Sequence, residues 1–141
     1  MPKTIYLPSK TVRETLMSES KPGTNALDPL KSLALKHQLP LKILEDHQIH
    51  NKPEVHLHEV DLWFCLEGEV LFACGGSLLH CQNRKKTDGS IDQNELFGDE
   101  IQNGNSYILK PGDWLWIPAG EPHQHGTKTT ARLMIIKIPQ V

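Results

Sequence analysis

The segment that begins at Gly112 constrains the fold most, because it fixes a tight corner between two extended stretches. Residues 114–117 are aromatic and aliphatic, as in a strand. Residues 118–122 read Pro-Ala-Gly-Glu-Pro and form the corner, with Gly112 and Gly120 free to adopt the φ values that such turns need. His123 then starts the next strand. The sequence therefore predicts one histidine at a defined place relative to two strands.

Short strand-like segments separated by turn residues occupy most of the chain. Its 141 residues suit a single domain, and ten prolines and ten glycines are spread along it rather than gathered in one linker. Hydrophobic residues make up 38% and charged residues 23%, a balance that does not indicate disorder. These features predict an all-β sandwich or barrel.

Two regions are expected along the chain. Residues 1–40 are predicted to form an N-terminal arm with one short helix, and residues 41–141 the barrel. The first 25 residues are weakly patterned and interrupted by prolines. Asp28 followed by proline looks like a helix start with Asp28 as N-cap, which predicts a helix near 29–38.

Residues 82–106 differ from the strands around them. They are polar and rich in turn residues, and we interpret them as an insertion on the barrel rim rather than as a domain. Asp88, Asp92 and Glu95 lie in this stretch, but their spacing does not fit a helix–loop–helix calcium site. A solvated acidic loop is the expected structure.

His56 and His58 are two residues apart. In a strand, such residues point to the same face, so both imidazoles can reach one point inside a barrel. Imidazole is a ligand for zinc, iron, copper or nickel. The pair alone leaves two interpretations open, a metal site or two surface histidines.

Taken with the corner, these residues resemble the cupin superfamily. The second motif of that family reads Gly-x5-Pro-x-Gly-x2-His-x3-Asn. Gly112, Pro118, Gly120 and His123 fall at the family spacing, and Thr127 stands where the family has asparagine.

The first cupin motif, Gly-x5-His-x-His-x3–4-Glu-x6-Gly, is matched in part. His56, His58 and Gly68 fit, His50 replaces the opening glycine, and Asp61 stands at the place of the glutamate with one spacer residue fewer. The resemblance covers about 41–139. It implies a double-stranded β-helix, or jelly-roll barrel, that holds one divalent transition metal ion (Fe, Zn, Ni or Mn).

The implied ligands are His56, His58, His123 and an acid. Asp61 is the first choice for the acid because its spacing to the closing glycine fits the motif. Glu59 is the alternative, although a neighbour of His58 normally faces away from it. A site of three histidines with water in the open positions is the fallback.

Two further residues are candidates for the surroundings of the metal. His125 lies two residues beyond His123 and faces the same way, so it could hold a proton near the ligands or lie at the barrel mouth. Trp63 shares a face with Asp61 and would wall a pocket or pack in the core. The same two roles, with core packing favoured, are open to Trp114 and Trp116.

Composition excludes several partner classes. The net charge is −2, with no basic excess for nucleic acid, and no apolar run approaches the roughly 20 residues of a membrane span. Cys65, Cys74 and Cys81 are an odd count and are expected to be buried thiols. We therefore expect a cytoplasmic protein that binds a small molecule.

Because an exposed edge strand needs cover, we also expect a homodimer.

Two functional hypotheses follow. The first is a metal-dependent, dioxygenase-like enzyme acting on a small polar or aromatic molecule, with isomerase chemistry as a variant. The second is a non-catalytic, metal-containing protein that binds or senses a small ligand. The cupin motifs are common to both classes and do not separate them.

Overall fold

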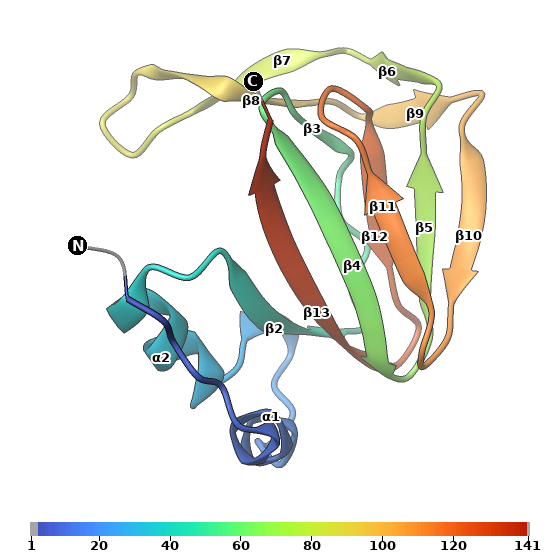
Figure 1. Cartoon of the computed structure of the whole chain (residues 1–141). Coiled ribbons are helices and arrows are strands. Elements are labelled where there is room, and N and C mark those ends of the chain that lie inside the picture. Colours follow the sequence, from blue (N-terminus) through green and yellow to red (C-terminus); the bar gives the residue numbers. More distant parts are fainter. Residues whose placement is uncertain (1–2, 141) are drawn as a thin grey trace.

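Strands dominate the structure, a computed structural model that describes residues 3–140. Two antiparallel sheets face each other, and two short helices lie beside one of them (Figure 1). The all-β prediction is confirmed.

The first sheet has five strands in the order β1-β2-β13-β4-β11. Its long central strands form the face of the barrel that is nearest the viewer in Figure 1. The bounds are β1 Gly23–Ala26, β2 Leu41–His47, β13 Thr130–Pro139, β4 Glu59–Glu67 and β11 Trp114–Ile117.

The second sheet has six strands in the order β10-β5-β12-β3-β8-β7, and β6 and β9 form a separate two-stranded sheet. The bounds are β10 Asn105–Leu109, β5 Val70–Cys74, β12 His123–Gly126, β3 Glu54–His56, β8 Ile91–Phe97, β7 Gln82–Lys85, β6 Ser77–Leu79 and β9 Glu100–Gln102.

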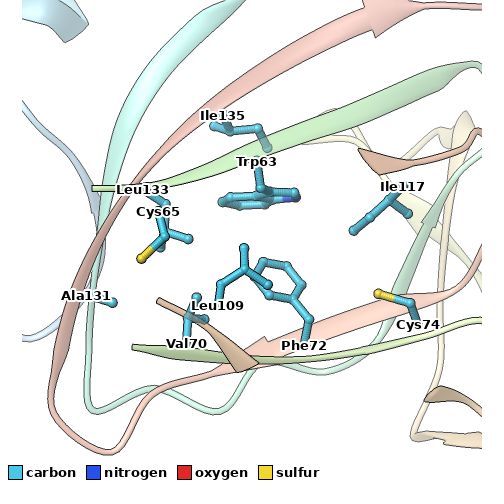
Figure 2. Close-up of a cluster of buried hydrophobic side chains, with 10 residues drawn as sticks. All are labelled: Trp63, Cys65, Val70, Phe72, Cys74, Leu109, Ile117, Ala131, Leu133 and Ile135. Atoms are coloured by element: carbon cyan, nitrogen blue, oxygen red, sulfur yellow. The ribbon is translucent and has the colours of Figure 1, made fainter. Parts of the chain in front are cut away.

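The core fills the space between the two sheets. Figure 2 shows Trp63 and Ile135 from the five-stranded sheet facing Phe72 and Val70 from the six-stranded sheet. Trp63 is buried, and its ring centroid lies 5.2 Å from that of Phe72. Core packing is therefore the structural role of Trp63.

A second apolar cluster joins the helices to the outer face of the five-stranded sheet. Helices α1 (Ser9–Leu16) and α2 (Leu30–His37) pack near β2, with Leu30 and Ile43 fully buried. The predicted helix is present, but it begins at Leu30 with Pro29 at the N-cap position, one residue later than the predicted start. Asp28 accepts a hydrogen bond from the Ser32 amide in the first turn.

The N-terminal arm contains a helix, α1, and a strand, β1, besides the one short helix that the sequence predicts. The sequence of α1 is short and rich in β-branched and polar residues, so its helix depends on packing against α2 and the sheet rather than on propensity. Strand β1 precedes residue 41, yet it pairs with β2 and extends the five-stranded sheet.

Residues 82–106 form more regular structure than a solvated loop. Strand β8 pairs with β3 on one side and with β7 on the other, so the segment widens the six-stranded sheet. In Figure 1 the β7–β8 hairpin projects beyond the barrel. The polarity of the segment follows from this projection, because β7 is exposed along its whole length.

Three side chains are more exposed than the sequence analysis expected. Trp114 and Trp116, for which core packing was favoured, lie at the surface on the edge strand β11, and Cys81 is an exposed thiol. Alternate residues of an edge strand point outward, which explains the exposure of the two tryptophans.

The homodimer stays a prediction. No helix within residues 3–140 is long and apolar enough to cross a membrane.

A buried ion pair fixes the chain before β1 to the barrel. Arg132 lies opposite Glu45 in the register of β13 and β2, and its Nη2 is 2.7 Å from Glu45 Oε2. The guanidinium also donates to the carbonyls of Leu16 and Ser18. Glu45 accepts a further hydrogen bond from the Lys21 amide.

We expect Arg132→Met to lower the free energy of unfolding by about 3–5 kcal/mol, because it leaves the Glu45 carboxylate buried without its cation. Urea unfolding followed by tryptophan fluorescence measures this loss. Lys10→Met is the control, since it removes an exposed ion pair with Glu14 and should leave the midpoint unchanged. Equal midpoints for the two variants would contradict the assigned role of Arg132.

Candidate metal centre

Strands β3 and β12 bring three potential ligands together. Glu54 and His56 are two residues apart in β3 and point to the same side of the sheet. Glu54 lies opposite His123 in the register of β3 and β12. The ligand atoms of these three side chains all lie within 4.8 Å of one another.

The corner predicted from the sequence holds His123 in place. Gly120 has a φ of +85°, in the left-handed region where glycine has no Cβ penalty. Its amide donates a 2.8 Å hydrogen bond to the carbonyl of His56, so the corner is tied to a second potential ligand. The Nδ1 atom of His123 lies 3.2 Å from the carbonyl of Glu121, which directs Nε2 toward the cluster.

Asp61 completes a compact group of four. It begins the inward face of β4 and is buried, and its Oδ2 atom lies 3.5 Å from His56 Nε2 and 3.4 Å from His123 Nε2. Glu54 Oε1 lies 3.4 Å and 3.6 Å from the same two nitrogen atoms. The structure thus places Asp61, the preferred acid of the sequence analysis, against both buried histidines.

His58 does not join the group. Strand β3 ends at His56, the chain bends at residues 57–58, and the His58 side chain is exposed. The expectation that His56 and His58 share one strand face was therefore wrong, because the two-residue alternation stops at the end of the strand. Glu54, two residues before His56, occupies the position that the pattern assigned to His58.

Lys137 adds a cation to the cluster. It lies opposite Asp61 in the register of β13 and β4, and its ammonium is 2.7 Å from Asp61 Oδ1 and 3.2 Å from His56 Nε2. One Asp61 oxygen therefore faces Lys137, and the other faces the two histidines.

The hairpin at 82–106 supplies the outer contacts of His56. Glu95 lies opposite His56 in the register of β3 and β8, and its Oε1 atom is 3.2 Å from His56 Nδ1. Arg84 joins Glu95 at 3.0 Å and Glu54 at 3.4 Å. A carboxylate near Nδ1 favours the tautomer whose Nε2 lone pair faces the cluster, where Lys137 also lies.

The close contacts among the charged side chains shift the pKa values of Glu54 and His56. Burial raises the pKa of Glu54, but the contacts with His123 and His56 outweigh it and hold the pKa well below the usual range. Burial lowers the pKa of His56, but the contacts with the carboxylates of Glu54 and Asp61 outweigh it, and the net shift is upward. The Glu54 carboxylate is thus ionised at neutral pH.

His125 lies apart from the cluster in a polar site of its own. Its Nδ1 is 2.8 Å from Asp46 Oδ2, and its Nε2 is 3.0 Å from the amide nitrogen of Asn51. The ring stacks on Phe72 and lies 5.2 Å from Trp63. Both ring nitrogens of His125 thus face polar groups other than the cluster, and Trp63 contacts His125 rather than the candidate ligands.

Glu59 lines a polar pocket of about 290 Å³ together with His58, Asp92, Asn94 and Glu95. It is therefore near the cluster without being one of the four converging side chains. We call this the acidic pocket, because carboxylates make up three of its five lining side chains.

Three residues of the centre were missed by the sequence analysis. Glu54 could have been found, because it stands two residues before His56 on a strand. Lys137 and Glu95 left no local signal. Lys137 meets Asp61 across a sequence separation of 76 residues, and Glu95 lies in a hairpin whose pairing with β3 the polar sequence does not indicate.

Comparison with known proteins gives matches at the level of structure only. No protein-family model and no curated protein sequence matches the chain. A recombinant oxalate oxidase in complex with glycolate is 19% identical, with a TM-score of 0.50, over 84% of this chain and 51% of that chain. The Drosophila melanogaster CENP-C cupin domain is 12% identical, with a TM-score of 0.48, over 81% of this chain and 67% of that one.

EutQ from Clostridium difficile is 12% identical, with a TM-score of 0.44, over 71% of this chain and 51% of that chain. The chain thus spans about half the length of the oxalate oxidase and of EutQ. These similarities concern the fold.

Two facing antiparallel sheets with a histidine–carboxylate cluster at one end define a jelly-roll barrel with a candidate metal site. The chain has the fold of the cupin superfamily. The fold expected from the two sequence motifs is therefore confirmed.

We expect Lys137→Met to raise the affinity of the protein for Co²⁺ by about tenfold or more, because it removes a positive charge 3.2 Å from a candidate ligand atom. Competition titration against a chromogenic chelator measures the dissociation constant. Lys42→Met is the control, since Lys42 lies on the neighbouring strand β2, opposite Ile135. Weaker binding by Lys137→Met would mean that the ammonium positions Asp61 instead of competing with the ion.

Proposed function

We propose that the protein binds one divalent transition metal ion at Glu54, His56, Asp61 and His123. The spacing of the ligand atoms carries this proposal. Each carboxylate has an oxygen 3.4–3.6 Å from the Nε2 atoms of both histidines, close to the edge of about 3.4 Å in a tetrahedron with metal–ligand bonds of about 2.1 Å. Glu54, His56 and His123 form the group whose ligand atoms are all mutually close, and Asp61 joins it through its contacts with the two histidines.

Buried atoms without hydrogen bonds support the fit. Asp61 Oδ2 and His123 Nε2 are both buried, and neither has a hydrogen-bond partner among the described residues. An unsatisfied buried polar atom costs about 1–3 kcal/mol. A cation between these atoms would remove that cost, and imidazole with carboxylate is a ligand set that iron, zinc, nickel and manganese accept.

The surroundings of the site favour an enzyme. The side chains of His123 and Asp61 are 2% and 1% exposed, whereas those of Glu54 and Lys137 are 29% and 25% exposed. The cluster is therefore sealed from water on one side and open on the other, as a site that admits a substrate requires. We propose a metal-dependent enzyme, dioxygenase-like, that acts on a small polar or aromatic molecule.

The chain's own residues have separate roles in this proposal. A bound metal would supply Lewis acidity, or dioxygen activation in the case of iron. Glu95 lies 3.2 Å from His56 Nδ1, where its carboxylate favours the tautomer whose Nε2 faces the cluster. Lys137 directs an ammonium at the open side, where it can bind an anionic substrate group or donate a proton.

One observation favours the second hypothesis, a non-catalytic binding protein. Four protein ligands would fill a tetrahedral shell, which is typical of closed structural sites. Oxygen uptake by the Fe²⁺-loaded protein with phenols and small hydroxy acids as substrates separates the two. Uptake above that of the His123→Ala variant supports the enzyme, and its absence supports the binding protein.

Metal titration tests the site itself. We expect wild type to bind one equivalent of Co²⁺ with the absorption bands of a low-symmetry site, and His123→Ala to bind about 100-fold more weakly or worse, because a ligand is lost. His58→Ala is the matched control and should bind as wild type does, since His58 is exposed and outside the cluster. Circular dichroism establishes that each variant is folded.

Two results would contradict the proposed ligands. If His58→Ala loses the metal while His123→Ala retains it, the ligands are not those of the cluster. If wild type binds no stoichiometric metal at all, the metal-dependent function fails.

A further inference from the structure

The structure contains a second pocket besides the acidic pocket. It has a volume of about 320 Å³ and lies between α2, the beginning of β2 and the end of β13. Leu35, Leu39 and Ile135 are among the seven apolar side chains that line it. Leu35 is 71% exposed, so the pocket presents apolar surface to solvent. Its size and lining are those of a small-molecule site.

The polar side chains of this pocket are all lysines. Lys31, Lys42 and Lys137 line it, and its ten lining residues include no acidic side chain. We call it the lysine pocket. The protein as a whole has a net charge of −2, so this grouping of lysines is a local departure from the average. Lys137 is ion-paired with Asp61, whereas Lys31 and Lys42 have no ion pair among the described residues. The positive charge of the lysines would attract an anionic ligand.

The backbone arranges these lysines from two directions. Lys31 stands three and four residues before Ala34 and Leu35, so all three share one face of α2. Lys42 lies opposite Ile135 in the sheet, and Lys137 is two residues beyond Ile135 on the same face. The helix and the sheet thus each contribute both apolar side chains and lysines to the pocket.

Lys137 connects the lysine pocket to the metal centre. Its side chain lines the pocket, while its ammonium contacts Asp61 Oδ1 and His56 Nε2. Lys137 is therefore the residue that the lysine pocket and the cluster share. The acidic pocket reaches the cluster through a different residue, Glu95, and repels anions.

We propose that the lysine pocket binds a small anion with an apolar or aromatic body, such as an aromatic carboxylate, with its anionic group at the lysines. This names the substrate class of the metal centre, and in that respect it rests on the proposed function. Binding to the pocket itself needs no metal, because Lys31, Lys42 and the apolar side chains hold the ligand, while Lys137 stays paired with Asp61.

A matched pair of fluorescent probes tests the binding on metal-free protein. 8-Anilinonaphthalene-1-sulfonate carries an anionic group, and N-phenyl-1-naphthylamine has the same rings without it. We expect Lys31→Gln/Lys42→Gln to weaken binding of the sulfonate about threefold to tenfold and to leave the neutral amine unchanged. Lys10→Gln/Lys110→Gln removes the same charge elsewhere and should change neither.

A reversed charge inside the pocket sharpens the test. Leu35 is exposed on α2, so its replacement leaves the core intact. Leu35→Glu should weaken the sulfonate more than Leu35→Gln does, because only the glutamate repels it. Amide chemical shifts should respond to the probe at Leu39 and Ile135. Equal affinities of all variants for the sulfonate, or chemical-shift changes confined to another surface such as β11, would contradict binding at the lysine pocket.

The link to the metal has a separate readout. With Co²⁺ bound, 3-phenylpropionate should alter the cobalt absorption bands in wild type and not in Leu35→Glu. Unchanged bands in wild type would refute the substrate class while the metal site stands. Conversely, probe binding by a protein that takes up no metal would refute the proposed function and leave the pocket established.

Discussion

The two-residue period of strand β13 is the constraint on which the barrel, the arm and the centre all depend. Its inward residues Ala131, Leu133 and Ile135 fill the core, and the next inward residue, Lys137, lies at the cluster. Arg132, on the opposite face, holds the chain before β1. A slip of one residue would place the charges in the core and the aliphatic side chains in solvent.

Charge balance at the centre follows from this register. Glu54, Asp61 and Glu95 bring three carboxylates together, and Lys137 and Arg84 supply two cations. The low pKa of Glu54 keeps its carboxylate ionised, and the contacts that lower it are those with His56 and His123. The three carboxylates thus depend on the histidines as well as on the two cations for their charge balance. A divalent ion held by the same histidines would supply positive charge at this place.

The sequence was most informative where geometry is local. The corner around Gly120 specifies the place of His123 within a few residues, and the structure agrees. The strand around His56 was recognised, but its end was not, and the bend at residues 57–58 was enough to exchange His58 for Glu54. Strand boundaries depend on tertiary pairing, which a single sequence does not show.

The rest of the centre could not be predicted because it depends on register between distant strands. Lys137 meets Asp61 only because β13 pairs with β4 in one of several possible alignments, and the alternation of β13 fits either face until the core is known. Glu95 was interpreted as part of a solvated loop because its neighbours are polar. Its segment nevertheless forms a strand beside β3, and polarity on a projecting hairpin does not exclude a role in the site.

The two pockets next to the centre carry opposite charges. The acidic pocket reaches His56 through Glu95, and the lysine pocket reaches the same imidazole through Lys137. An anion is attracted on one side and repelled on the other, so its negative group is oriented before it reaches the cluster. A neutral molecule would gain nothing from this arrangement, and a cation would be drawn to the wrong side of His56. The polarity of the site thus discriminates among ligands by charge, whatever reaction the metal supports.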